Sequence, residues 1–161
     1  MISIIGIGFP ASRLAQKFVS IKNYKVYQLN DKIERNSKYK RKIKSFENPE
    51  EYENNIPDLK KFFSEITDRV QVFVVGSSMS SNYSLGVLEQ LKDKQVDVFY
   101  IKPDSELLTG IPKLVDKVVF SVLQEYARSG LLKSLTVISN ELLENHLGSV
   151  PIKKYYDTLN E

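Results

Sequence analysis

The stretch FVVGSSMSSNYSLG, residues 73–86, decides the fold class. Its first three residues and the preceding Val72 form an apolar run typical of a buried strand, and the run ends at Gly76. A loop of small polar residues follows, and a helical pattern begins at Tyr83. A strand that leads through a short loop to a helix N-terminus is the unit with which α/β proteins hold phosphate. Such loops are usually built from glycine and this one is built from serine, so the stretch predicts the fold and leaves the ligand open.

The N-terminal residues predict a β-α-β unit within 30 residues. Residues 2–8 and 24–30 have strand patterns, and residues 10–21 have a helical one with Pro10 in a first-turn position. The apolar residues at helical spacing are Leu14, Ala15, Phe18 and Val19. Two strands joined by a helix must run parallel, with a right-handed crossover.

The rest of the chain repeats this alternation after a charged excursion over 31–57. We expect a helix over 58–66 with Asp58 as its N-cap. We expect a long helix in the stretch 113–132, whose apolar face carries Leu114, Val118, Val122 and Leu123. Gly130 fits the C′ position at which such a helix ends. The remaining patterns predict strands over 70–76, 96–102 and 134–140, and helices over 84–94, 141–147 and 151–160. The order predicts one domain over 1–161, an α/β doubly wound parallel sheet of Rossmann-like type that binds ligands past the carboxyl ends of its strands.

Composition excludes several classes of site. The 161 residues contain no cysteine and one histidine, His146, so a disulfide, a zinc–thiolate site and a histidine cluster within one chain are excluded. No catalytic group or metal site is predicted. The net charge of +3 does not by itself imply nucleic acid. The chain has neither a long apolar run nor a signal-peptide pattern, so we expect a cytoplasmic protein with no membrane partner.

With these elements placed, nearly the whole chain resembles the nucleotide-binding half of the FtsZ/tubulin family. IIGIGFPASRLAQKF (4–18) resembles the family's first strand and glycine loop, and YQLND (27–31) its second strand. The serine loop occupies the place of the family's Gly-Gly-Gly-Thr-Gly-Thr-Gly signature. VDVFYIKPDSELLTG (96–110), GLLKSLTVISNELL (130–143) and LGSVPIKKYYDTLNE (147–161) resemble the following strands and the start of the central helix.

The resemblance implies a site for GTP or GDP, with Mg²⁺ or without it. By position, Tyr156 would stack on the base, and Asn160 with Glu161 would face the guanine edge. A carboxylate there suits the N1–H and N2–H₂ donors of guanine, and an aromatic face suits stacking. The nucleotide-binding residues implied by the resemblance are Gly6, Gly8, Asn30, Gly76, Ser77, Ser78, Ser80, Ser81, Asn82, Asn140, Tyr156, Asn160 and Glu161.

Two departures qualify what the resemblance implies. The signature loop has lost most of its glycines, which let backbone amides approach a phosphate without an intervening Cβ. The chain also ends inside the expected central helix, so we expect the family's second, activating domain to be missing. Hydrolysis would then require carboxylates from a partner chain. The first hypothesis is therefore a minimal FtsZ/tubulin-like protein with weak or vestigial guanine-nucleotide binding, which associates with itself or with a larger homologue.

Two other functions stay open. One is a structural or assembly module, such as a phage virion component, that keeps the fold and binds no nucleotide. The other is a small Rossmann-type dinucleotide binder, because Asp31 stands near the position of a ribose ligand. The basic cluster Lys38 to Lys44 is interpreted mainly as a charged face exposed to solvent. The alternative interpretation is a patch that binds a phosphate backbone or an acidic partner.

Overall fold

The computed structural model describes residues 2–67, 69–76, 78–103 and 108–139. The first half of the chain forms β1 (Ile2–Ile7), α1 (Phe9–Gln16), β2 (Tyr24–Asn30), β3 (Lys40–Lys42) and α2 (Pro49–Asn54). The second half forms β4 (Arg69–Val75), the 3₁₀ helix η1 (Met79–Tyr83), α3 (Ser84–Glu89), β5 (Gln95–Lys102), α4 (Gly110–Ser129) and β6 (Ser134–Ser139). The predicted strands are present, and β3 and α2 lie in the charged excursion over 31–57. Within the described residues no helix has both the length and the apolarity to cross a membrane.

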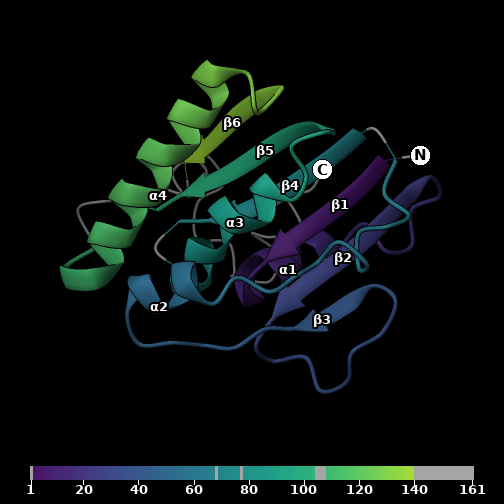
Figure 1. The fold of residues 1–161 in the computed structure, drawn as a ribbon, viewed down its shortest axis with the longest axis horizontal. Helices are drawn as coiled ribbons and strands as arrows, with labels where there is room; N and C mark the ends of the chain where they lie inside the picture. Colours follow the sequence, from purple (N-terminus) through teal and green to yellow (C-terminus); the bar gives the residue numbers. More distant parts are fainter. Residues whose placement is uncertain (1, 68, 77, 104–107, 140–161) are drawn as a thin grey trace, which may run out of the picture.

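The six strands form one sheet in the order β3-β2-β1-β4-β5-β6, and every neighbouring pair is parallel (Figure 1). This confirms the predicted doubly wound parallel sheet. The chain first adds strands outward from β1 to β2 and β3, and then returns to pair β4 with the other side of β1. The strand order therefore reverses between β1 and β4, where Ile5 is in register with Val72.

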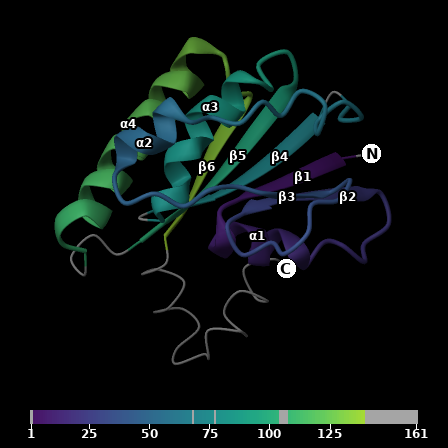
Figure 2. The same ribbon diagram turned by 60° about the horizontal axis from the view of Figure 1, so that its bottom comes forward.

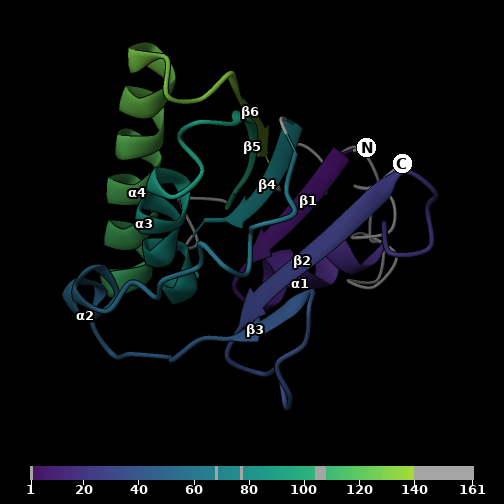
Figure 3. The same cartoon turned by 45° about the vertical axis from the view of Figure 1, so that its right-hand side comes forward.

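The reversal places the helices on both faces of the sheet (Figures 2 and 3). Crossovers of one hand put a helix on opposite faces when the direction of strand addition changes. α1 therefore covers one face, over a small core that includes Ile4, Val26 and Phe73. The helices α2, α3 and α4 cover the other face, over a larger core. Four tyrosines fill that larger core, and all are at most 2% exposed: Tyr27, Tyr52, Tyr83 and Tyr100.

The predicted helix over 58–66 is wrong, because the segment forms turns. The side chain of Gln90 fixes the start of this segment: its Oε1 accepts from Leu59 N at 2.7 Å and its Nε2 donates to Pro57 O at 2.9 Å. Asp58 Oδ1 accepts from Lys60 N at 3.1 Å, which is a local turn and not a helix cap. The apolar side chains of the segment are buried in the larger core, so a helix-like spacing of apolar residues arises here from turns.

Helix α4 ends at Gly130 as predicted, with φ +87°, but its buried face differs from the predicted one. Leu123 is buried, whereas Leu114 and Val118 are 56% and 43% exposed. The side chains that face the sheet are those of Val115, Asp116, Val119 and Leu123. Apolar spacing could not reveal this rotation, because one residue of the inward face is an aspartate.

Candidate functional site

The strand reversal identifies the candidate site at the carboxyl ends of β1 and β4. In open α/β sheets, ligands bind outside the carboxyl ends of the strands where the order reverses. β1 ends at Ile7 and is followed by Gly8, and β4 ends at Val75 and is followed by Gly76. The loops that begin at these two glycines therefore form the walls of any site of this type.

Gly8 makes the turn from β1 into α1. It has φ +90° and ψ 165°, a conformation open in practice to glycine alone, and its N–H donates to Leu29 O at 2.6 Å. Pro10 follows in the first turn of α1, as predicted. Gly6 serves packing, because a Cβ on it would lie 2.6 Å from Ala11 O. Both glycines are thus explained by the strand-to-helix connection.

The serine loop lies directly against this turn. A Cβ on Gly8 would be 2.8 Å from Ser80 Cβ and 3.5 Å from Ser78 Oγ. The side chains of these two serines therefore occupy the space beside Gly8 at the strand reversal. Ser77 lies outside the described residues.

Ser81 and Asn82 are turned into the protein. Ser81 is fully buried, and its Oγ donates to Ser78 O at 2.6 Å. Asn82 is 4% exposed, and its Nδ2 donates to Met79 O at 2.8 Å. These bonds hold η1, which precedes the short helix α3. The next residue, Tyr83, donates to Lys44 O at 2.7 Å, and burial raises its pKa to about 12.

Gly76 borders a buried polar network. A Cβ on Gly76 would lie 2.5 Å from Tyr100 Oη and 2.7 Å from Asp116 Oδ1. Tyr100 donates a hydrogen bond to Asp116. Burial is the main cause, and this hydrogen bond the second, that raises the pKa of Tyr100 far above its usual range. Lys102 Nζ donates to Asp116 Oδ2 at 2.9 Å and lies 4.7 Å from the centroid of the Phe120 ring. Because Gly76 has no side chain, the end of β4 can lie against the hydrogen bond between Tyr100 of β5 and Asp116 of α4.

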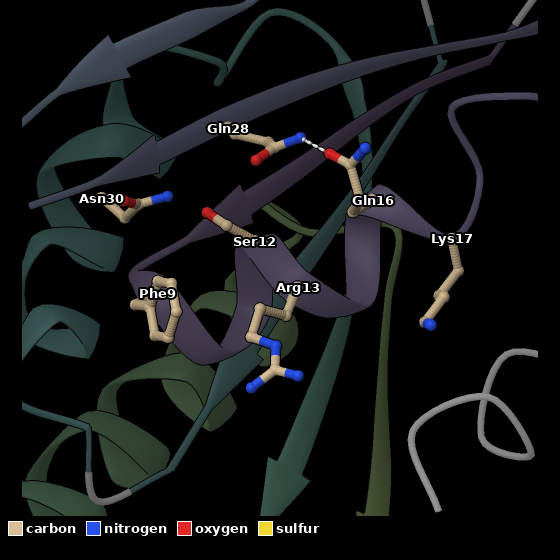
Figure 4. A pocket seen from close by; sticks show the side chains of 7 residues that line it. All are labelled: Phe9, Ser12, Arg13, Gln16, Lys17, Gln28 and Asn30. Atoms are coloured by element: carbon tan, nitrogen blue, oxygen red, sulfur yellow. Dashed lines mark hydrogen bonds between the residues drawn. The ribbon is translucent and has the colours of Figure 1, made fainter. Parts of the chain in front are cut away.

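A cavity of about 280 Å³ opens beside α1, between that helix and β2 (Figure 4). Its side chains come from alternate positions of β2, which face α1, and from one side of the helix. Gln28 donates to Gln16 across the cavity, and the Arg13 guanidinium carbon lies 5.9 Å from the centroid of the Phe9 ring. Asn30 is buried, and its Oδ1 accepts from Lys32 N at 2.8 Å. The cavity is lined by Phe9, Ser12, Arg13, Gln16, Lys17, Gln28 and Asn30.

The structure gathers only some of the predicted site residues. Gly8, Ser78 and Ser80 meet at the strand reversal, Gly6 packs against the start of α1, and Asn30 lines the cavity beside α1. Besides Ser77, four of the predicted site residues lie outside the described residues: Asn140, Tyr156, Asn160 and Glu161. The sequence interpretation missed Arg13, Gln16 and Gln28. Their signal was present in the helical spacing of 9, 13 and 16 and in the alternation of 28 and 30 along β2.

Comparison with solved structures settles the fold. CetZ from Methanosaeta thermophila superposes with a TM-score of 0.74 at 12% identity, over 99% of this chain and 50% of that one. The empty FtsZ dimer of M. jannaschii gives a TM-score of 0.76 at 15% identity, over 99% and 50%. The chain has an FtsZ/tubulin-type fold. It spans about half the length of either structure. No protein-family model and no curated protein sequence matches this FtsZ/tubulin-type chain.

Proposed function

We propose that this FtsZ/tubulin-type chain acts by associating with other protein chains and that it holds guanine nucleotide weakly at most. The partner is a second copy or a larger FtsZ/tubulin-like protein. The observation that carries the proposal is the contact of Ser80 with Gly8 at the strand reversal, where a Cβ on the glycine would lie 2.8 Å from the serine Cβ. Side chains take up the space in which a glycine-rich loop would present its amides to a phosphate.

The hydrogen bonds of the loop amides support weak phosphate binding. Gly8 N donates to Leu29 O, Gly76 N donates to Ile101 O at 2.9 Å, and Ser81 N donates to Ser78 O at 3.0 Å. Two amides just past the strand ends and one in η1 are thus already paired within the protein. A phosphate would have to break these bonds or rely on serine hydroxyls.

The nucleoside end of the proposed site rests on the resemblance alone. In this proposal Tyr156 stacks on guanine, and Asn160 with Glu161 reads its edge. GTP or GDP, with or without Mg²⁺, would be held without a hydrolytic centre of its own. A partner chain would have to supply the carboxylates that activate water.

An apolar stripe on α4 supports the association. Ile111, Leu114 and Val118 are 49%, 56% and 43% exposed, and their spacing places them on one side of the helix. Single exposed apolar residues are ordinary, whereas contiguous groups mark interaction surfaces. Leu114 and Val118 of this stripe belong to the face that the sequence pattern had assigned to the core.

Thermal melting with millimolar GTP, GDP, ATP or NAD plus Mg²⁺ tests the nucleotide part. A ligand at 100 times its dissociation constant adds about 2.7 kcal/mol of apparent stability. We expect GTP and GDP to give far less than this, ATP and NAD to give nothing, and Tyr156→Ala to remove whatever guanine-specific shift exists. A full-sized shift with GTP would contradict the proposal, and a shift with NAD alone would favour a dinucleotide binder.

Sedimentation velocity without nucleotide tests the association part. We expect the weight-average sedimentation coefficient to rise with protein concentration. Leu114→Ser with Val118→Ser should abolish this rise. The matched control, Lys113→Ser with Lys117→Ser, changes exposed polar positions of the same helix and should keep it. A monomer at every concentration, alone and with a larger FtsZ/tubulin-like protein, would refute the association.

A further inference from the structure

We propose that this protein has a second ligand site, at the β3 edge of the sheet, which binds the phosphate group of a small organic phosphate. The site is a cavity of about 360 Å³ between the segment that leads into β3 and the turns over 58–66. β3 lies at the edge of the sheet, with β2 and β1 between it and β4, so the cavity is separate from the strand reversal. Its volume is within the range of small-molecule sites and exceeds what a bare ion fills.

Positive charge dominates the cavity wall. Three cationic side chains line it, those of Lys38, Arg41 and Lys61, against one carboxylate, that of Glu65. Lys38 Nζ lies 2.7 Å from Glu65 Oε2, and this bond raises the pKa of Lys38 and lowers that of Glu65. One cation is thereby neutralised and two remain. Among the described residues, no hydrogen bond or ion pair engages the side chain of Arg41 or Lys61.

A buried hydroxyl at the same cavity lacks a partner. Tyr27 lines the cavity and is 1% exposed, and its Oη makes no hydrogen bond to any of the described residues. The rings of Tyr39 and Phe62 stand edge-on to it, with centroids at 5.2 and 5.4 Å, so they enclose the phenol without bonding it. Burial raises the pKa of Tyr27, so the hydroxyl keeps its proton and is a donor. Buried polar groups are nearly always paired, and an unpaired donor in the same cavity as two unpaired cations favours an anionic ligand.

The donor set favours phosphate over other anions. A guanidinium offers a planar fork of N–H groups, an ammonium offers a point charge, and a phenol offers one directed O–H. These are the donor types that suit the oxygens of a phosphate monoester. Phe62 adds an aromatic wall, and Glu65 can accept from a hydroxyl group of the rest of the ligand. These two features fit a small organic phosphate better than inorganic phosphate alone.

Titration followed by amide chemical shifts tests the site on the full chain. The probes are inorganic phosphate, pyrophosphate and glucose 6-phosphate. We expect saturable shifts over 37–41 and 61–65, with glucose 6-phosphate binding tighter than phosphate. Arg41→Gln and Lys61→Gln should each weaken binding by about tenfold, which corresponds to the loss of one charge-assisted hydrogen bond. The matched controls Lys42→Gln and Lys60→Gln remove exposed charges that do not line the cavity and should change affinity less than about twofold.

Tyr27→Phe separates a ligand role from a structural one. The variant keeps the ring contacts and removes only the unpaired hydroxyl, so we expect an unchanged or higher melting temperature together with weaker phosphate binding. The proposal is overturned by unsaturable shifts, by equal losses in the cavity variants and the controls, by undiminished binding in Tyr27→Phe, or by single-stranded RNA binding tighter than all three small probes.

Discussion

Gly8 carries two constraints at the residue scale, one from its backbone and one from its neighbour. Its φ of +90° with ψ 165° is closed to residues with a Cβ, and Ser80 Cβ stands 2.8 Å from where such an atom would lie. We predict that Gly8→Ala lowers the free energy of unfolding by about 2–6 kcal/mol, since strain and overpacking each cost about 1–3 kcal/mol. Urea denaturation measures this loss.

Gly110 is the matched control for Gly8. It also has positive φ, at +63°, but a Cβ on it would meet no atom within 4 Å. We expect Gly110→Ala to cost only about 1 kcal/mol. Adding Ser80→Gly to Gly8→Ala should recover the stability that was lost to overpacking. The stability that was lost to backbone strain should not return. Equal costs at both glycines would show that the serine loop does not press on the turn.

The raised pKa of Tyr83 predicts that the protein loses stability at alkaline pH. Burial raises its folded-state pKa from 10.0 to about 12, so the unfolded chain releases this proton first as the pH rises. The contribution of the neutral hydroxyl is full below pH 10 and is lost between pH 10 and about 12. Near neutral pH, Tyr83→Phe should lower the free energy of unfolding by about 1 kcal/mol, because the hydrogen bond to Lys44 O is lost. The free energy of unfolding of this variant should also fall less steeply as the pH rises above 10. Urea denaturation at about pH 8 and about pH 11 checks both, and an unchanged alkaline slope would contradict the assignment.

Individual site residues were the hardest part to predict from the sequence. The carboxyl ends of the strands could be located, and Gly8, Ser78 and Ser80 do meet there. The direction of a side chain in a loop follows no periodicity, however, so the inward turn of Ser81 and Asn82 gave no signal. The resemblance to the FtsZ/tubulin family points only to positions that match its motifs. Arg13 and the cavity beside α1 are not among these positions and were therefore missed.

At the scale of elements, part of the basic cluster Lys38 to Lys44 forms the edge strand β3. β3 is the edge strand next to β2, and its outer groups are satisfied by the preceding segment: Lys42 N donates to Asn36 Oδ1 at 2.7 Å, and Lys40 O accepts from Ser37 N at 2.8 Å. Lysines on such an edge disfavour pairing with another chain. We predict that Asn36→Ala with Lys40→Thr and Lys42→Thr lowers the temperature at which light scattering rises.

The control for this prediction is Lys60→Thr with Lys61→Thr, which removes the same charge from outside any strand. It should leave the onset of scattering unchanged. An equal fall in both variants would mean that net charge, and not the strand edge, keeps the protein apart.

The types of most elements were predictable from burial, and the orientation of helices was not. The apolar runs of β1, β4 and β5 stand out in the sequence because these strands are largely buried, whereas β2 was recognisable by its alternation. α4 was placed along the chain but rotated wrongly, because Asp116 faces inward to meet Tyr100 and Lys102. The segment 58–66 was taken for a helix because the side chain of Gln90, 31 residues away from Leu59, fixes its backbone instead. Such long-range polar bonds leave no local pattern.

At the scale of the whole molecule, the seam between β1 and β4 joins the two halves of the sheet. The larger core crosses this seam, since it contains Ile5 and Tyr27 from one half and Val72 and Val98 from the other. The small core also crosses it, because Ile4 packs with Phe73. Packing on both faces across one seam implies that the two halves unfold together.

Native-state hydrogen exchange tests this cooperativity. We predict that the slowest amides of β1, β2, β4 and β5 all report one free energy of opening, equal to that from urea denaturation, while β3 and β6 at the edges open at lower cost. Val72→Ala lies at the seam with 0% exposure and should lower the free energy of all four central strands by the same amount, about 2 kcal/mol. If β1 and β2 kept their protection while β4 and β5 lost it, the halves would be separate cooperative units, and the strand reversal would be a hinge between them and not a fixed wall of the site.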